Sequence, residues 1–418
     1  MMKRFIYIIS AILTVVSCMD IGTIDPYAED LHTISISLSL PEGVDAKAAA
    51  GVKIAVSDVS NGNPFETTTD ASGKASITLP NGLYRVSVSL SANDELYSAS
   101  EDRIRLSGED REISLGLLKV KTGDIVIKEI YCGGCKKLPQ EGEYQSDKYI
   151  ILHNNADRML YLDSLCFGMI SPPNATAANP WIKKDPATGS NIYPDFVPIF
   201  EAVWQFGGSG KDFPIMPGED AVIAVCGAID HAAQYPLSVN LNHEDYFVCY
   251  NTTYFPNTYY HPAPGDRIRQ ERILNVVIKT GQSNAFPFSV SSPGVAIFKA
   301  KGTTMHEFIG KEGSLIQIPG TTGGSRAVCI PFEWVEDAVE VFDGRSSNNT
   351  KRFVTQLDGG YIYQSTTYQG HTLMRRTNEN KSQAAGYEVL VDTNNSSNDF
   401  YERDTQSLHA AGEGGSDE

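Results

Sequence analysis

The stretch TTTDASGKASITLPNGLYRVSVS, residues 67–89, decides the fold of the first part of the chain. In its second half apolar and polar residues alternate, a period of two that is typical of strands with one buried face. The same alternation recurs in ISISLSL (34–40), VKIAVSDV (52–59) and REISLGLL (111–118). Asn-Gly and Asp-Ala-Ser-Gly turn signals separate these segments. Short strands joined by such turns predict a small β-sandwich over residues 32–120.

The same stretch resembles the carboxypeptidase-regulatory-like, transthyretin-like superfamily, whose hallmark is TDxxG followed by LPxGxY. The matching residues are Thr69, Asp70, Gly73, Leu79, Pro80, Gly82 and Tyr84. In that superfamily the module usually serves as a spacer or stalk. The resemblance therefore implies a first domain that carries no chemistry of its own.

The second region opens with GDIVIKEIYCGGC (123–135) and EYQSDKYIILHNNADRMLYLDSLCFGMI (143–170). This order of strand, polar turn and strand resembles the lamin-tail β-sandwich, although Ile151 and His153 stand where glutamate and tyrosine are usual. Further segments resemble one uncharacterised Bacteroidota lipoprotein family, a domain of unknown function: PIMPGEDAVIAV (214–225), GVAIFKAKG (294–302), WVEDAVEVFD (334–343), HTLMRRT (371–377) and GYEVLVDTNNSSNDF (386–400). The resemblance implies an all-β chain with a larger sandwich over residues 121–405, in the setting of TonB-dependent outer-membrane receptors.

Two segments of this region are predicted to be long loops inserted in the sandwich. Residues 171–215 are rich in Pro, Gly and Asn, and residues 250–266 read YNTTYFPNTYYHPAPGD. Loops of such length in a compact domain are often functional. Their aromatic rings can stack on a ligand or a partner, or can cap an open end of the sandwich. The predicted ligand-binding residues are Trp181, Trp204, Tyr254, Tyr259, Tyr260 and His261.

The N-terminus predicts export and lipid attachment. Residues 1–17 begin with basic residues and continue with an apolar run, as secretory signals do. That run is shorter than the roughly 20 residues of a membrane-spanning helix. Its ending resembles the lipobox of bacterial lipoproteins, which implies that Cys18 carries a lipid; an ordinary signal peptide cut elsewhere is the alternative. We expect residues 18–31 to form an acidic tether and residues 406–418 a disordered tail.

Charge and motif content argue against several classes of function. With 34 basic and 51 acidic residues, the chain has a formal net charge of −17, which disfavours nucleic acid as a partner. The HExxH and GxSxG motifs are absent. The glycine-rich segment PGTTGGSR (319–326) lacks the lysine of a phosphate-binding loop. We therefore expect no cofactor and no catalysis, with a metal- or thiol-dependent enzyme as the least favoured interpretation.

Cys132 and Cys135 form the sharpest local motif, CGGC. Thiols at this spacing can form a local disulfide, stay reduced, supply half a zinc site or act as a redox pair. No second CxxC or HxxxH completes a zinc site, and an all-β setting lacks the helix N-terminus that activates a redox thiol. A disulfide is therefore the favoured prediction. The remaining cysteines lie in apolar runs and are expected to be buried, although Cys226–Cys249 and Cys166–Cys329 bridges are also allowed.

Metal binding stays open at this stage. Asp230-His231 and His243-Glu244-Asp245 place carboxylates beside imidazoles. The oxygen-rich segment DTNNSSNDF (392–400) suits calcium, but Asx turns explain the same residues equally well.

The sequence as a whole predicts a non-catalytic lipoprotein of the outer membrane, exposed at the cell surface. Its membrane contact is the lipid anchor, because no second apolar run of spanning length follows. We expect it to bind a small ligand or to dock to an outer-membrane receptor, as an accessory to TonB-dependent uptake of a nutrient or metal. A structural or adhesive surface protein is the alternative.

Overall fold

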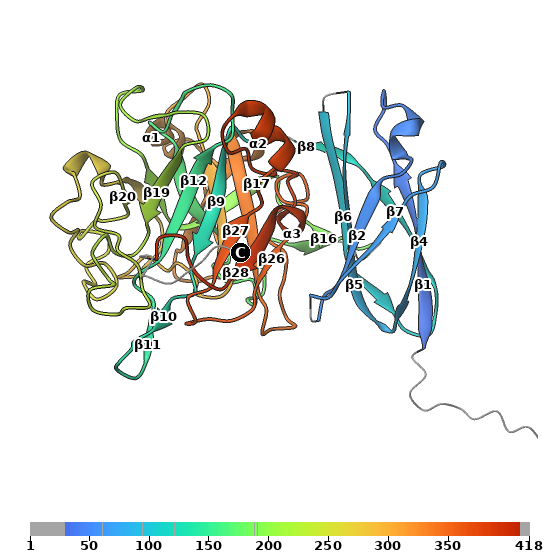
Figure 1. Ribbon diagram of the computed structural model, residues 1–418, viewed down its shortest axis with the longest axis horizontal. Coiled ribbons are helices and arrows are strands. Elements are labelled where there is room, and N and C mark those ends of the chain that lie inside the picture. Colours follow the sequence, from blue (N-terminus) through green and yellow to red (C-terminus); the bar gives the residue numbers. More distant parts are fainter. Residues whose placement is uncertain are drawn as a thin grey trace, which may run out of the picture.

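The computed structural model describes residues 30–409, apart from residues 61, 94, 121, 188 and 190, as two β-sandwiches side by side along the long axis (Figure 1). This architecture confirms the all-β prediction. Cys18, the signal segment and most of the tether lie outside the described residues. Within the described ranges, no helix combines the length and apolar character needed to cross a membrane.

The smaller sandwich packs a three-stranded sheet, in the order β4–β1–β7, against a five-stranded sheet, in the order β3–β2–β5–β6–β8. Its alternating apolar residues, among them Ile34, Ile36, Val86 and Val88, form one buried core. Its strands are β1 (Leu31–Ser39), β2 (Lys53–Asp58), β3 (Pro64–Thr68), β4 (Lys74–Pro80), β5 (Gly82–Ala92), β6 (Glu95–Leu106), β7 (Arg111–Gly116) and β8 (Leu118–Val120).

The larger sandwich packs a six-stranded sheet against an eight-stranded one. The first has the order β20–β19–β12–β9–β27–β28, and the second β23–β24–β17–β14–β22–β25–β26, with β21 paired to β17. The long strands are β9 (Ile125–Tyr131), β12 (Tyr149–Asn154), β14 (Cys166–Ile170), β17 (Phe196–Gln205), β19 (Asp220–Ala224), β21 (Asn275–Lys279), β22 (Gly294–Phe298), β24 (Arg326–Pro331) and β25 (Val335–Asp343).

Shorter elements complete the larger sandwich. The other strands of its two sheets are β20 (Phe247–Val248), β23 (Leu315–Gln317), β26 (Ile362–Gln364), β27 (Thr372–Arg375) and β28 (Phe400–Arg403). Small two-stranded ribbons are β10 (Cys135–Lys136) with β11 (Glu143–Tyr144), β13 (Leu160–Tyr161) with β18 (Pro214–Ile215), and β15 (Lys183–Lys184) with β16 (Asn191–Ile192). The helices are short: α1 (Met305–Ile309), α2 (Glu379–Ala385) and α3 (Ser396–Asp399).

Strand β17 corrects one prediction from the sequence. The segment from Phe196 to Gln205 was expected in a long loop, but it lies inside the eight-stranded sheet and pairs with β14, β21 and β24. Pro198 and Glu201 interrupt the apolar run and conceal the strand. Glu201 adopts a φ of 65° at a bulge, where the sheet register shifts. Its buried carboxylate accepts a hydrogen bond from the Ser283 backbone at 2.9 Å.

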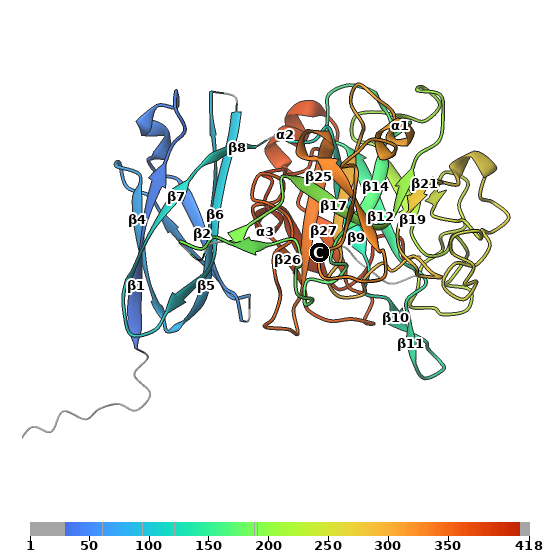
Figure 2. The ribbon, with the colours of Figure 1, turned by 180° about the vertical axis from the view of Figure 1, so that it is seen from behind.

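An earlier part of the predicted loop 171–215, the β15–β16 ribbon, lies at the junction of the two sandwiches. In Figure 2 the β15–β16 ribbon extends from the larger sandwich toward the smaller one. At this junction Arg85 of β5 is fully buried, lies 4.3 Å from the ring centre of Tyr361 and donates a hydrogen bond to the carbonyl of Gly359. The Tyr363 hydroxyl donates to the carbonyl of Val59 at 2.9 Å. Polar contacts therefore hold the smaller domain against the larger one.

The last described residues also differ from expectation. Residues 406–409 fall in the predicted disordered tail, but they are bonded to the larger sandwich. Gln406 is buried and donates to the carbonyl of Leu237 at 3.0 Å, and the Ser407 backbone donates to Glu129 at 3.1 Å. These hydrogen bonds to the larger sandwich account for the order of residues 406–409. Residues 410–418 lie outside the described part.

Candidate functional site

A hollow of about 970 Å³ opens on the larger sandwich, and we call it the Arg272 groove. Three segments line it: 207–213, 250–253 and 269–276. The first belongs to the segment 171–215 and the second to the segment 250–266, the two regions that the sequence marked as candidate binding loops. The structure therefore brings parts of both segments together around one hollow, within the 300–1,000 Å³ that is usual for ligand sites.

The first wall is held by a buried carboxylate. Asp163 accepts hydrogen bonds from the backbone N–H groups of Gly210, Asp212 and Phe213 at 2.8–2.9 Å. Burial alone would raise the pKa of Asp163, but these backbone donors outweigh it and lower the pKa. Gly208 is required beside it, because its φ is 92° and a Cβ atom there would lie 2.1 Å from an Asp163 oxygen.

The other two walls are anchored by buried apolar residues. Phe255 lies in the core and its backbone N–H donates to the carbonyl of Asn251 at 2.9 Å, which fixes the segment 250–253. Leu274 is buried and its N–H donates to Val248 at 2.9 Å. Immediately after it, Asn275 begins β21, which pairs with the end of β17. The groove therefore stands on rigid parts of the sandwich.

Arg272 is the charged residue that distinguishes this groove. Its guanidinium carbon lies 5.3 Å from the ring centre of Phe213 and 4.5 Å from that of Phe247. The side chain makes no hydrogen bond with the residues that the structure describes, and its Nε is buried without a partner. The nearest carboxylate oxygen, on Asp245, lies 3.6 Å from Nη2. Burial, together with the charge of Arg269, lowers the pKa of Arg272.

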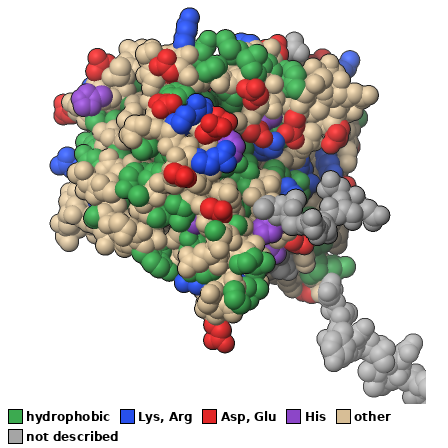
Figure 3. All heavy atoms as spheres, turned by 60° about the vertical axis from the view of Figure 1, so that its left-hand side comes forward, with side chains coloured by type: hydrophobic (Ala, Val, Ile, Leu, Met, Phe, Trp, Pro, Cys, Tyr) green, Lys and Arg blue, Asp and Glu red, His purple; other side chains and the backbone are tan. Residues whose placement is uncertain are grey.

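The neighbouring Arg269 is different. Its Nε donates to the carbonyl of Glu244 at 3.0 Å and its Nη2 donates to Asp245 at 2.7 Å. On the side of the molecule shown in Figure 3, acidic and basic side chains alternate with apolar ones and form no extended field of one sign. Unlike Arg269, Arg272 therefore offers a positive charge whose donors make no hydrogen bond with the described residues.

The residues predicted to bind ligand divide into two groups. Trp181, Trp204 and His261 are buried: Trp204 stacks on Phe255 between the sheets, and His261 accepts a hydrogen bond from the Phe286 backbone at 2.9 Å. These three belong to the core because their rings fill space between strands. Tyr254 and Tyr259 are exposed and Tyr260 is partly exposed, but none of the three lines the Arg272 groove.

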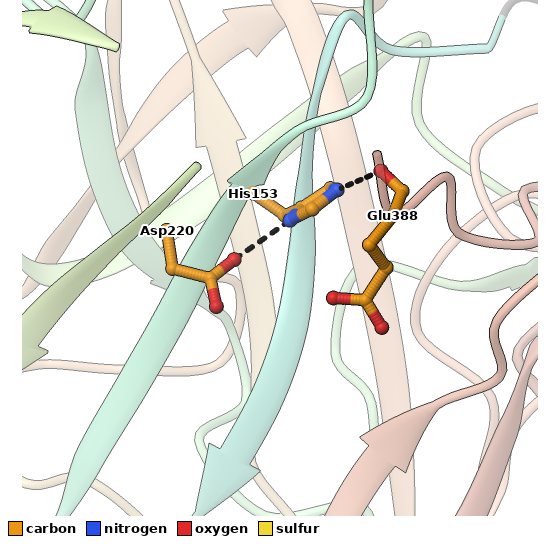
Figure 4. Close-up of side chains that lie close together, drawn as sticks. All are labelled: His153, Asp220 and Glu388. Carbon is orange, nitrogen blue, oxygen red and sulfur yellow. Dashed lines mark hydrogen bonds and ion pairs between the residues drawn. The ribbon is translucent and has the colours of Figure 1, made fainter. Parts of the chain in front are cut away.

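A second group of charged residues lies on the six-stranded sheet. His153 of β12 is buried, with Nδ1 2.6 Å from Asp220 and Nε2 3.1 Å from the backbone carbonyl of Glu388 (Figure 4). Each ring nitrogen therefore has a carboxylate or carbonyl oxygen within hydrogen-bond distance. The Nζ of Lys128 lies 2.6 Å from Asp220 and 2.6 Å from the Glu388 carboxylate. The Lys128 ammonium therefore bridges the two carboxylates, and His153 bonds to one of them.

This group, the His153 network, has the residue types of a metal site but not the free ligand atoms. His153, Asp220 and Glu388 offer ligand atoms within 4.8 Å of one another. An ion would have to displace the Lys128 ammonium and a ring proton. Burial alone would lower the pKa of Lys128, but its two carboxylate partners raise it. Burial alone would raise the pKa of Asp220, but His153 and Lys128 lower it. The contacts favour a structural ion network.

The segment considered for calcium is also satisfied internally. Asp399 accepts hydrogen bonds from the backbone and hydroxyl of Thr393 at 2.9 and 2.7 Å. The buried Arg375 guanidinium lies 2.5 Å from Asp337 and 3.5 Å from both Asp392 and Asp399. A guanidinium therefore occupies the position among these carboxylates where a cation would bind.

The six described cysteines are free and buried. The favoured disulfide between Cys132 and Cys135 is not formed in the structure: Cys132 donates to Gln364 at 3.3 Å and Cys135 donates to Asp147 at 3.6 Å. The two thiols have separate acceptors, which stabilise the reduced form. Burial raises the pKa of each of these two thiols to about 12.

Residues 216–407, which include Arg272, match the family model described as "Protein of unknown function (DUF4876)". The match lies in the C-terminal half of the chain. A crystal structure of a DUF4876 family protein from Bacteroides thetaiotaomicron is similar, with 22% identity, a TM-score of 0.55 and coverage of 88% of this chain and 94% of that chain. This likeness supports the two-sandwich fold, and it supports the resemblance to Bacteroidota proteins that the sequence indicated.

Other comparisons add little to the DUF4876 assignment. A DUF3823 family protein from Parabacteroides merdae matches with 12% identity and a TM-score of 0.16, covering 43% of this chain and 82% of that chain. None of the curated proteins matches the chain.

Sequence reasoning missed Arg272. The sequence does contain a signal: the segment DRIRQERIL (266–274) has three arginines within six residues, although the chain as a whole is strongly acidic. What the sequence does not contain is the pairing of these arginines. Asp245 accepts a hydrogen bond from Arg269 at 2.7 Å but lies 3.6 Å from Arg272, beyond hydrogen-bond distance, and this difference depends on the position of Asp245 in space.

Proposed function

We propose that the protein is a non-catalytic binding protein of the bacterial envelope whose Arg272 groove captures a small ligand. The observation that carries the proposal is the convergence of the two candidate loop segments on one 970 Å³ hollow with a stacked arginine that lacks hydrogen-bond partners. Convergent polar groups in a preformed hollow are typical of ligand sites.

Side-chain chemistry supports a binding rather than a catalytic role. Of the acidic residues lining the groove, Asp212 already accepts two hydrogen bonds from Ser209, at 2.6 and 2.9 Å. A thiol nucleophile needs a lowered pKa, whereas burial raises the pKa of Cys226 to about 11 and that of Cys329 to about 12. The partners of Asp212 and the raised pKa of these two thiols therefore support binding rather than catalysis.

The proposal includes a place and a partner. Lipid on Cys18 would hold the protein at the outer membrane, with the smaller sandwich as a spacer that lifts the groove from the surface. There the larger sandwich would dock to an outer-membrane receptor and deliver the ligand to TonB-dependent uptake. The signal-like N-terminus and the likeness to a Bacteroides protein support this setting.

Thermal unfolding of the purified full chain tests ligand capture. The probes are neutral hexoses, uronic acids, amino acids and four-carbon dicarboxylates, because a ligand that binds the native state raises Tm. Asn275→Trp fills the exposed wall of the groove, and Thr258→Trp is the matched control on an exposed position outside it. We expect at least one probe to raise the Tm of the wild type and of T258W but not of N275W. No response to any probe, or an equal response in N275W, would contradict the proposal.

A further inference from the structure

The chemistry of the Arg272 groove indicates the class of its ligand. A guanidinium presents its donors in a planar fork that matches the two oxygens of a carboxylate. Stacking on Phe213 and Phe247 fixes the plane of this fork before a ligand arrives. Preorganisation of this kind reduces the entropy lost on binding.

Arg272 also lies where a ligand can reach it. It lines both the 970 Å³ groove and an adjoining hollow of about 460 Å³. Phe213 and Asp212 line both hollows as well. The guanidinium is therefore part of a wall shared by two open spaces, although its Nε itself is covered.

The rest of the groove carries uncharged polar groups. Thr252, Thr253, Gln270 and Asn275 line it, and their side chains make no hydrogen bond with another described residue. Hydroxyl and amide groups both donate and accept, as the hydroxyls of a sugar require. Tyr250 adds a half-buried ring, whose face can stack on an apolar face of a sugar ring.

We propose that the groove binds a carboxylate-bearing saccharide. Its carboxylate would bind the Arg272 guanidinium, and its ring hydroxyls would bind the uncharged polar side chains of Thr252, Thr253, Gln270 and Asn275. The inference rests on the proposed function, because it names the ligand class of the same groove. The volume of 970 Å³ accommodates more than one sugar ring.

The charges around the groove favour one negative charge on the ligand over two. Arg269 is already engaged by Asp245 and by the carbonyl of Glu244, so it adds few free donors. Asp212 and Glu271 also line the groove and repel a dianion such as phosphate. The net charge of −17 belongs to the whole chain, and charges more than about 8 Å away are screened at physiological ionic strength. The charge of Arg272 therefore determines the attraction of the groove for an anion.

Calorimetric titration of the full chain tests the inference. The acidic probes are galacturonate and N-acetylneuraminate, each with one carboxylate and each compared with its methyl ester, which keeps the hydroxyls and removes the charge; inorganic phosphate is titrated separately. The variants are R272M, which removes the fork, and R272K, which keeps the charge. R267M is the matched control, because Arg267 is exposed on the same segment and does not line the groove.

We expect the wild type and R267M to bind at least one acid roughly tenfold to a hundredfold more tightly than its ester, the usual range for a charge-assisted hydrogen bond. R272M should bind acid and ester equally, and R272K should keep part of the preference. The inference is overturned if neither acid binds, if acid and ester bind equally to the wild type, if R272M keeps the preference, or if phosphate binds more tightly than both acids. Capture of an uncharged probe that N275W blocks would leave the proposed function standing while this inference fails.

Discussion

The His153 network and the Arg272 groove place charged side chains in opposite situations. In the network, both nitrogens of His153 and the ammonium of Lys128 have acceptors between 2.6 and 3.1 Å. In the groove, Arg272 packs against two aromatic rings, and the single ion pair that it forms with a described residue, Asp245, spans 3.6 Å. The network contains more titratable groups than the groove, yet both nitrogens of His153 and the ammonium of Lys128 already have partners within the protein.

The difference shows that residue type alone does not identify a site. A His, an Asp and a Glu close together suggest a metal centre until their partners are counted. Desolvated charges that are fully paired mainly contribute to the fold, whereas donors without partners retain their capacity for a ligand. The predictions below test this division between paired and unpaired charges.

The largest effect should come from a buried charge with three acidic partners. Arg375→Met would leave Asp337, Asp392 and Asp399 without their counter-ion, and removing one partner of a buried ion pair costs about 3–5 kcal/mol. Urea unfolding of the full chain measures this loss. Arg376→Met is the matched control, because Arg376 is the adjacent, exposed residue. Equal stability of the two variants would show that the buried charges are not coupled.

The His153 network should cost less to break. His153→Gln can keep only part of the bonding to Asp220 and to the Glu388 carbonyl, so we expect a loss of about 1–3 kcal/mol in the free energy of unfolding. Because Lys128 occupies the position between the carboxylates, zinc or EDTA should leave the wild-type Tm unchanged. Stoichiometric zinc that raises Tm, with the rise lost in H153Q, would turn the network into a metal site.

The pH dependence should separate the two kinds of carboxylate. Burial, with repulsion from Asp392, raises the pKa of Asp399 to about 7 against the attraction of Arg375. The native state then holds a proton more tightly than the unfolded state, so this stabilisation is complete below the unfolded value of 3.8 and is lost as the pH rises through 7.

Comparison with two variants isolates these contributions. Relative to D399N, the wild type should lose stability between about pH 4 and 7, with a slope approaching about 1.4 kcal/mol per pH unit. Asp220 has a lowered pKa, so relative to D220N the wild type should lose stability as the pH falls below about 4. Unfolding curves at several pH values measure both, and slopes of the same sign in both comparisons would contradict the assignment.

Local alternation made much of the fold predictable. The period of two in β1, β2 and β5 places Ile34, Ile54 and Val86 in one core, as expected from sequence. Strand β17 escaped prediction because Pro198 and Glu201 lie within it, and only the bulge and the neighbours of Glu201 explain how the sheet tolerates them. A bulge that depends on distant partners leaves little trace in local sequence.

The candidate site was predictable only in part. The segments beginning at residues 171 and 250 were singled out by composition, and both reach the groove. Their aromatic residues were poor guides, since Trp204 and His261 serve the core. Arg272 could not be separated from Arg269 by sequence, because the distinction lies in their distances to Asp245: 2.7 Å for Arg269, a hydrogen bond, and 3.6 Å for Arg272. Hydrogen-bond satisfaction is a property of the folded chain.

One paired measurement tests the division most directly: the free energy of unfolding of R272M and of H153Q, each with and without galacturonate or N-acetylneuraminate. Without ligand, R272M should stay within about 1 kcal/mol of the wild type, since it gives up cation–π contacts but no hydrogen bond. At the same concentration of acidic sugar, R272M should lose the ligand-induced gain that the wild type and H153Q retain. A ligand-free R272M destabilised as much as H153Q, with its response to the acidic sugar intact, would show that Arg272 serves the fold and not a ligand.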